Sequence, residues 1–149
     1  MFRLIRYMVY FLSFFFLINW WSPYLKTNID PKLEPYYNEY IGIVKQYCKD
    51  NQYNHPDFKL VFGKMRRNEI GYCQISPNSF KIIIDKKYFK EANEDHRFST
   101  IAHEFSHCNF EIPHFNSPQH YMYYADTNIP KAMVIYQLKE ILKYKCNKD

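Results

Sequence analysis

The strongest constraint on the fold of this chain is a pair of histidines, His103 and His107, in a segment whose apolar residues recur with a helical period. Side chains four residues apart project from nearly the same side of an α-helix, so these two imidazoles face the same way. At about 100° per residue, Phe98, Ile101 and Phe105 point to the opposite side. We therefore predict an amphipathic helix that buries its apolar side and turns both imidazoles toward a cleft.

The residues around this histidine pair complete a motif with recognisable chemistry. Glu104 directly follows the first histidine in an HExxH arrangement, where a carboxylate lies beside a shared metal ion and can act as a general base. Pro113 excludes the residue before it from the helical conformation, and Asn109 tolerates the left-handed one, so the chain can turn back after the helix. His114 then becomes the third candidate ligand. Three protein nitrogens leave one position of a zinc ion open, which is typical of a catalytic site.

This arrangement resembles the metzincin metallopeptidases, in which the usual pattern HExxHxxGxxH is followed by a methionine turn. Met122 corresponds to the methionine beneath the metal, and Tyr124 to a tyrosine that in some branches approaches zinc or the oxyanion. The third histidine comes one residue late, and Asn109 or Phe110 stands in place of the family's glycine. The longer HExxH-x6-H spacing is similar to that of small bacterial and phage metallopeptidases.

The resemblance implies a small metzincin-like zincin domain that hydrolyses peptide or protein substrates. In such an enzyme His103, His107 and His114 hold Zn²⁺. Glu104 takes a proton from the attacking water, and Tyr124 assists the reaction. The alternative is a membrane-anchored, catalytically inactive binding or interaction module on the same fold, which would not cleave peptides.

The resemblance also implies features of the sheet. The strand Ile70–Ile75 would be the exposed edge along which an extended peptide adds as a further strand. Cys73 would then lie near Cys108, which makes this pair the first choice for a disulfide. From the residues alone, the four cysteines, which also include Cys48 and Cys146, allow three full pairings. None of them belongs to a CxxC pair, so we do not expect thiolate ligands.

The N-terminal segment differs in composition from the rest of the chain. Two arginines precede Tyr7–Trp21, which has no charged side chain and is about as long as the apolar region of a signal peptide. We predict an apolar helix within residues 1–22 that acts as a signal anchor or signal peptide, then a linker at 23–30 and a peptidase domain at 31–149. Arginines before an apolar run stay on the cytoplasmic side, so we expect a membrane-anchored or exported protein with an extracytoplasmic catalytic domain.

The remaining segments predict one α+β domain. Asp30 and Pro31 are typical of a helix start, and apolar residues then recur at helical spacing to about Lys49. The segments that follow indicate a short twisted sheet and two later helices, one with the histidines and one near the C-terminus. We expect strands at Phe58–Phe62, Ile70–Ile75 and Phe80–Asp85, and helices at Asn93–Cys108 and from Pro130.

The charge of the chain does not indicate a nucleic-acid partner. Lysine and arginine exceed aspartate and glutamate by 20 − 15 = 5, a modest excess. The one tight basic cluster, at Lys64, Arg66 and Arg67, falls in a predicted loop and is accompanied by no recognition helix or base-stacking module. We expect a monomer that binds a peptide or protein substrate.

Three other residues offer rival ligands. Glu140 would replace His114 in the arrangement of the gluzincin enzymes, although it is more simply a solvated residue of the C-terminal helix. His96 and His120 are also candidates, but isolated histidines of this kind are more often surface residues. The triad that includes His114 is therefore the preferred interpretation.

Overall fold

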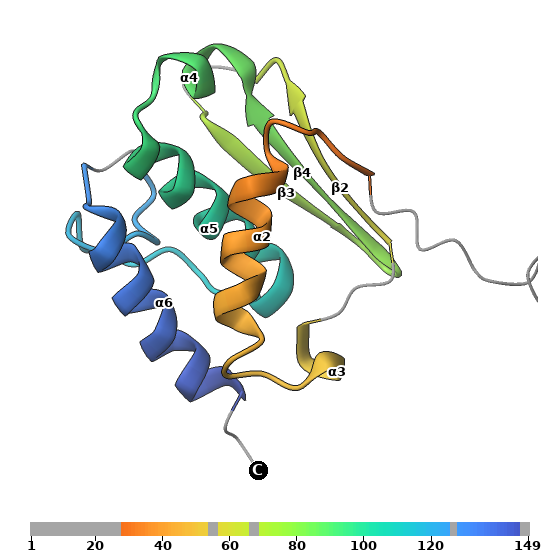
Figure 1. Ribbon diagram of the computed structural model, residues 1–149, viewed down its shortest axis with the longest axis vertical. Coiled ribbons are helices and arrows are strands. Elements are labelled where there is room, and N and C mark those ends of the chain that lie inside the picture. Colours follow the sequence, from red (N-terminus) through yellow and green to blue (C-terminus); the bar gives the residue numbers. More distant parts are fainter. Residues whose placement is uncertain (1–27, 54–56, 66–68, 126–127, 147–149) are drawn as a thin grey trace, which may run out of the picture.

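The computed structural model describes residues 28–53, 57–65, 69–125 and 128–146, and it has an α+β fold with a four-stranded sheet and helices packed against it (Figure 1). In this part of the chain the strands are β1 (Asn28–Ile29), β2 (Phe58–Gly63), β3 (Gly71–Ser76) and β4 (Ser79–Asp85). The helices are α2 (Glu34–Val44), α3 (Asp50–Tyr53), α4 (Lys86–Glu91), α5 (Glu94–Phe110) and α6 (Lys131–Cys146). The predicted class, the short sheet, the histidine helix and the C-terminal helix are confirmed.

The sheet has the strand order β1-β2-β4-β3, which places β3 at an edge. β2 is parallel to both β1 and β4, whereas β3 and β4 form an antiparallel pair. Burial alternates along β4, where Phe80, Ile82 and Ile84 are buried and the residues between them are partly exposed. The alternation shows that one face of the sheet forms the core.

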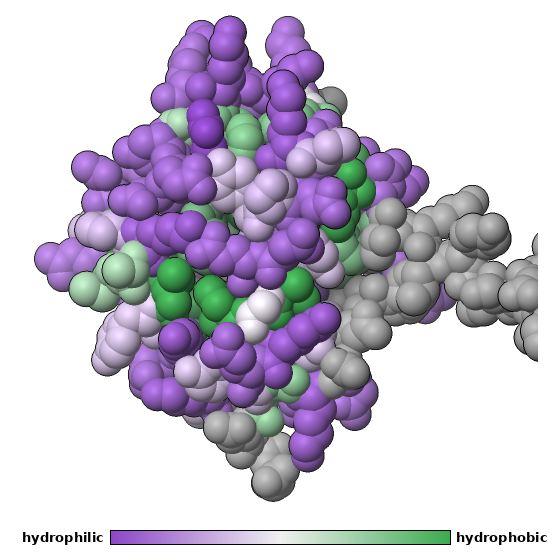
Figure 2. All heavy atoms as spheres, viewed as in Figure 1, coloured by the Kyte–Doolittle hydropathy of each residue, from purple (hydrophilic) through white to green (hydrophobic). Residues whose placement is uncertain are grey.

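Phe105 of α5 lies in the core between the sheet and α2. Its ring is 1% exposed and stacks on Tyr40 of α2, with 5.1 Å between the centroids. It also meets the rings of Phe58 and Phe80 edge-on, at 5.8 and 6.0 Å. The outer surface of this side of the molecule is mostly hydrophilic, with only a narrow hydrophobic band across it (Figure 2). The apolar side of α5 is therefore buried, as predicted.

The first helix begins one turn later than predicted. The backbone carbonyl of Asp30 accepts the N–H groups of Leu33 and Glu34, so the intervening residues form a turn before the helix. Pro35, and not Pro31, occupies the first helical turn. The predicted N-cap at Asp30 is therefore wrong, because Leu33 precedes the helix and makes no side-chain cap hydrogen bond.

Several short elements were not predicted. Asn28 and Ile29, which the prediction placed in the linker, pair with β2 as β1. α2 ends at Val44, not near Lys49, and the chain then turns into α3. α4 follows β4 directly and begins at a cap provided by Asp85. Elements of two to six residues are too short to show a period in the sequence.

All four cysteines form disulfides. Cys73 of β3 is bonded to Cys108 of α5, with 5.8 Å between the Cα atoms, so the first choice for a pair is confirmed. Cys48, which follows α2, is bonded to Cys146 at the end of α6, with a Cα distance of 5.0 Å. The first bond ties the edge strand to the histidine helix, and the second ties two helices together.

The predicted signal anchor or signal peptide at residues 1–22 lies outside the described residues, as does the first part of the predicted linker. In the part of the chain that the structure describes, no helix combines the length and the apolar character needed to cross a membrane. Membrane attachment through the N-terminal segment therefore stays a prediction.

Candidate metal centre

The end of α5 sets the direction of the loop that carries the third histidine. The helix continues through Phe110, and Glu111 then takes the left-handed conformation with a φ of 51°. Its N–H donates to the carbonyl of His107 at 3.0 Å, the bond of a common helix ending. The expectation that Asn109 or Phe110 takes the place of the family's glycine at the turn is wrong, because both remain helical. The chain instead reverses at Glu111, and this reversal still brings His114 back toward α5.

The ring nitrogens of His103, His107 and His114 converge. Nε2 of His107 lies 3.0 Å from Nε2 of His103 and 3.1 Å from Nε2 of His114, and the third distance is 3.2 Å. Two rings come from consecutive turns of α5 and the third from the loop after it. Among the described residues, these three histidines form the one group of potential ligands that lie close enough together to hold a metal ion. The three predicted ligands are therefore brought together.

Hydrogen bonds to backbone carbonyls determine which ring nitrogen of His103 and of His107 carries the hydrogen. Nδ1 of His103 is 2.7 Å from the carbonyl oxygen of Tyr121, and Nδ1 of His107 is 2.5 Å from that of Ile112. A carbonyl oxygen only accepts, so each Nδ1 carries the hydrogen, and each Nε2 of a neutral ring presents a lone pair. Two lone pairs 3.0 Å apart repel each other. A cation between them removes the repulsion, and this backbone bonding is usual for metal-ligating histidines.

The distances and the protonation of the rings fit a zinc-sized ion. Two ligands of a tetrahedral zinc ion with Zn–N bonds of about 2.0–2.1 Å are about 3.3 Å apart. The Nε2 atoms here are 3.0 to 3.2 Å apart. Burial lowers the pKa of His103 to about 4 and also lowers the pKa of His107. Both rings are therefore neutral at physiological pH, which is the form that binds a metal.

Glu104 is buried against the first residues of β3. Its side chain is 6% exposed, and a Cβ atom added to Gly71 would lie 2.6 Å from its Oε1 atom. Burial raises the pKa of Glu104 to about 8, and the negative charge of Glu69 adds to the effect. The backbone N–H of Cys73, which donates to the carboxylate, acts in the opposite direction. A cation at the triad would also favour the ionised carboxylate.

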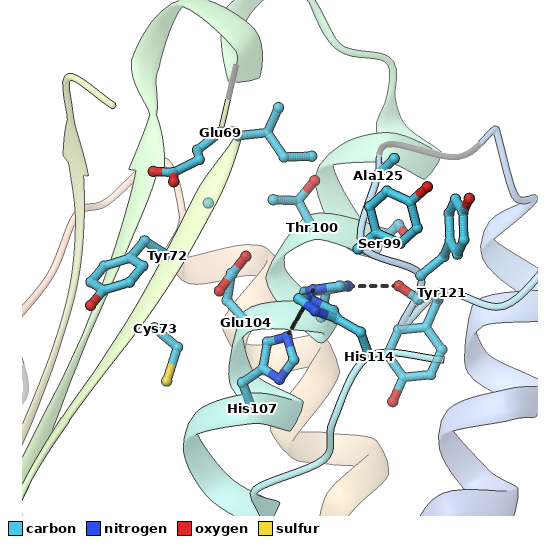
Figure 3. A pocket seen from close by; sticks show the side chains of 15 residues that line it. Glu69, Tyr72, Cys73, Ser99, Thr100, Glu104, His107, His114, Tyr121 and Ala125 are labelled. Atoms are coloured by element: carbon cyan, nitrogen blue, oxygen red, sulfur yellow. Dashed lines mark hydrogen bonds between the residues drawn. The ribbon is translucent and has the colours of Figure 1, made fainter. Parts of the chain in front are cut away.

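The triad and Glu104 line one open pocket of about 550 Å³. Figure 3 shows Glu104 and His107 on the same side of α5, with His114 approaching from the loop. Tyr124 also lines this pocket; it is 67% exposed, and its ring centroid lies 4.2 Å from that of Tyr123. The structure places Tyr124 in the pocket wall, and its role in a reaction stays a prediction.

The loop after the third histidine is bound to α5 through Tyr121. The hydroxyl of this residue lies 2.9 Å from the hydroxyl of Ser106, and its carbonyl accepts the Nδ1 hydrogen of His103. Met122, the next residue, is fully buried. Its carbonyl accepts the N–H of Phe115 at 2.9 Å, which joins the two arms of the loop. The loop that contains Met122 is thus packed against α5 and bonded to one ring of the triad, and its identity as a methionine turn stays a prediction.

The rival ligands lie elsewhere. Nε2 of His96 is 3.2 Å from the side-chain oxygen of Asn128, and Nδ1 of His120 accepts a backbone N–H within the loop. Glu140 forms a salt bridge with Lys143 on the exposed side of α6, at 2.7 Å. None of the three belongs to the triad that the described residues form.

Four residues shape the site through contacts that were not predicted from the sequence. Tyr121 and Ile112 act through backbone carbonyls, which no sequence motif marks. Gly71 is one of only three glycines in the chain, which is a weak signal of a close contact but does not identify Glu104 as its neighbour. No sequence signal marks Glu69. Comparisons with family models, curated proteins and solved structures find no match to this chain.

Proposed function

We propose that this protein is a zinc-dependent peptidase in which His103, His107 and His114 hold the ion and Glu104 is the general base. The observation that carries the proposal is the convergence of three Nε2 atoms beside a buried carboxylate. Structural zinc sites use four protein ligands, whereas three leave a position for a reacting group. The open pocket in front of the triad supports access for a substrate.

Zinc suits this set of ligands because neutral imidazole nitrogens bind it well. When bound, it supplies a Lewis acid that polarises the scissile carbonyl and lowers the pKa of water. Glu104 accepts a proton from the attacking water and later delivers it to the leaving nitrogen. The C–N bond breaks, a C–O bond forms, and the hydrogens of the water molecule end on the new carboxyl and amino groups. The reaction consumes nothing but water.

The same proposal extends to a metzincin-like domain. Its support is the HExxH helix, the third histidine after a left-handed residue, and the buried Met122 in the loop that follows His114. Tyr124 would donate its hydroxyl to the developing oxyanion, and its exposed position in the pocket wall supports that role. An extended peptide would add along β3, an edge strand that lines the pocket through Gly71, Tyr72 and Cys73.

The disulfides support a location outside the cytosol. All four cysteines are paired, and such bonds persist in oxidising compartments. We propose that the catalytic domain is exported or is held at a membrane by the N-terminal segment. Alkylation of free thiols in protein from fractionated cells would test this, because a cytosolic protein would be labelled at its cysteines.

The test of the function is the metal content and proteolytic activity of the full-length chain. We expect about one zinc per chain by elemental analysis, and zinc-dependent cleavage of unstructured peptides detected by mass spectrometry. Glu104→Gln should keep the zinc and lower kcat by about 10²- to 10⁴-fold. Glu91→Gln, which neutralises an exposed carboxylate on α4, should change neither property.

Two further variants separate the ligands from their rivals. His114→Ala should weaken zinc binding, whereas His120→Ala should leave the zinc content unchanged. Zinc binding without cleavage of any peptide by the wild-type protein would favour the non-catalytic binding module. Retention of zinc at wild-type affinity in His114→Ala would refute the proposed ligand set.

A further inference from the structure

The pocket differs in charge from the rest of the molecule. The chain has a formal net charge of +5, yet no lysine or arginine is found among the described residues that line the pocket. The two carboxyl groups among its lining residues are those of Glu104, which is buried, and Glu69, which is exposed. A cationic protein therefore presents a locally acidic wall at the site where a substrate would bind.

Glu69 is exposed at this pocket. It lies just before β3 and is exposed, and it belongs to neither of the salt bridges found among the described residues. It lines the same pocket as Glu104 and the histidine triad. A cation bound by Glu69 would thus lie in the same pocket as the reacting groups.

An exposed aromatic ring accompanies this carboxylate. Tyr72 is 49% exposed and lines the same pocket. Because side chains alternate along a strand, Tyr72 lies on the face of β3 opposite to Cys73, which is bonded to α5. In Figure 3, Glu69 and Tyr72 both extend to the side of β3 away from Glu104. A carboxylate and an aromatic ring together favour lysine and arginine side chains, through an ion pair and a cation–π contact.

We propose that Glu69 and Tyr72 form a subsite for a lysine or arginine side chain of the peptide substrate. This inference rests on the proposed function and names the class of substrate. In an extended peptide paired with the edge of β3, neighbouring side chains point to opposite sides. One side chain therefore passes over Glu69 and Tyr72, while the side chains next to it face α5.

The first test is a binding measurement that does not depend on cleavage. Fluorescent peptides that differ at a single position, with lysine, norleucine or glutamate, are titrated with full-length, zinc-loaded Glu104→Gln protein. At one position the lysine peptide should bind about five- to tenfold more tightly than the norleucine peptide. Adding Glu69→Gln should bring this ratio near one, whereas adding Glu91→Gln, which changes the net charge equally, should preserve it. Glu69→Lys should reverse the preference toward glutamate.

Equal binding of lysine and norleucine peptides at every position, or a ratio that survives Glu69→Gln, would overturn the subsite. Cleavage of the same peptides by protein with an intact Glu104 is a separate readout. There, Glu69→Gln should raise KM for the lysine peptide and leave KM for the norleucine peptide nearly unchanged. Preferential binding of lysine peptides without any cleavage would contradict the peptidase function and support the subsite.

Discussion

Replacing Gly71 with alanine should disable catalysis while the metal site stays intact. The added Cβ would lie 2.6 Å from Oε1, 2.8 Å from Cγ and 2.9 Å from Cδ of Glu104. Non-bonded carbon atoms prefer separations of about 3.5–4.0 Å, so the carboxylate must move by about 1 Å. Gly71 does not have a positive φ. Alanine therefore fits the backbone there, and the change acts through the space that Glu104 occupies.

A displacement of about 1 Å in a reacting group costs about 100-fold in rate, which corresponds to about 2.7 kcal/mol of transition-state stabilisation. The shift would also strain the bond from the Cys73 N–H to the carboxylate. The three imidazoles come from α5 and the loop after it. Zinc content should therefore remain at about one ion per chain, and kcat should fall much more than peptide affinity.

The assay compares kcat, zinc content and melting temperature in the wild type, Gly71→Ala and Gly42→Ala. Gly42 is a matched control, because a Cβ atom at this position of α2 would meet nothing within 4 Å. Alanine there should stabilise the helix by about 0.5–1 kcal/mol and leave kcat unchanged. If Gly71→Ala folds, binds zinc and cleaves peptides at the wild-type rate, Glu104 is not held against β3 in the reaction and the reasoning fails.

Three further predictions concern stability, each measured by denaturant unfolding. Replacing Cys48 and Cys146 with serine should lower the free energy of unfolding by up to about 5 kcal/mol, because their bond spans a sequence separation of 98. Asp85→Ala should cost about 1 kcal/mol near neutral pH, since the carboxylate caps α4 by accepting the N–H of Tyr88 at 2.7 Å. That bond lowers the pKa of Asp85. The contribution of the cap to stability is therefore complete above the pKa of Asp85 in the unfolded chain and is lost as pH falls through its pKa in the folded protein. The stabilities of the wild type and Asp85→Ala should converge in acid. Phe105→Ala, which empties a site in the core, should cost about 3–5 kcal/mol, and a loss under 1 kcal/mol would contradict the packing described.

The histidine helix could be predicted because its signals are local. The apolar side that contains Phe105, the cap at Asn93 and the spacing of the two histidines all lie within one short segment. Each signal depends on helical geometry alone. The third ligand was also within reach, because Pro113 marks the chain reversal that precedes His114.

The contacts that complete the site depend on residues far apart in the chain. The contact between Gly71 and Glu104 joins a strand to a helix, and no local pattern encodes it. The left-handed residue was misplaced for a different reason: propensity favours Asn109 over Glu111. In the structure, the bond from Nδ1 of His107 to the carbonyl of Ile112 holds the turn one residue beyond the helix end. A side-chain bond to a residue five positions along the chain therefore outweighed the preference of a single residue.

Different segments hold the two parts of the candidate site. The imidazoles are oriented by backbone carbonyls of the loop after α5, whereas Glu104 is held by β3 through Gly71 and the N–H of Cys73. The disulfide between Cys73 and Cys108 is the covalent link between these parts. Metal binding and proton transfer should therefore be separable by mutation, because only the second depends on where β3 lies. If β3 did not hold the carboxylate of Glu104, the protein would be expected to bind zinc without hydrolysing peptides. The position of β3 therefore decides between the two functions considered, a peptidase and a non-catalytic binding module.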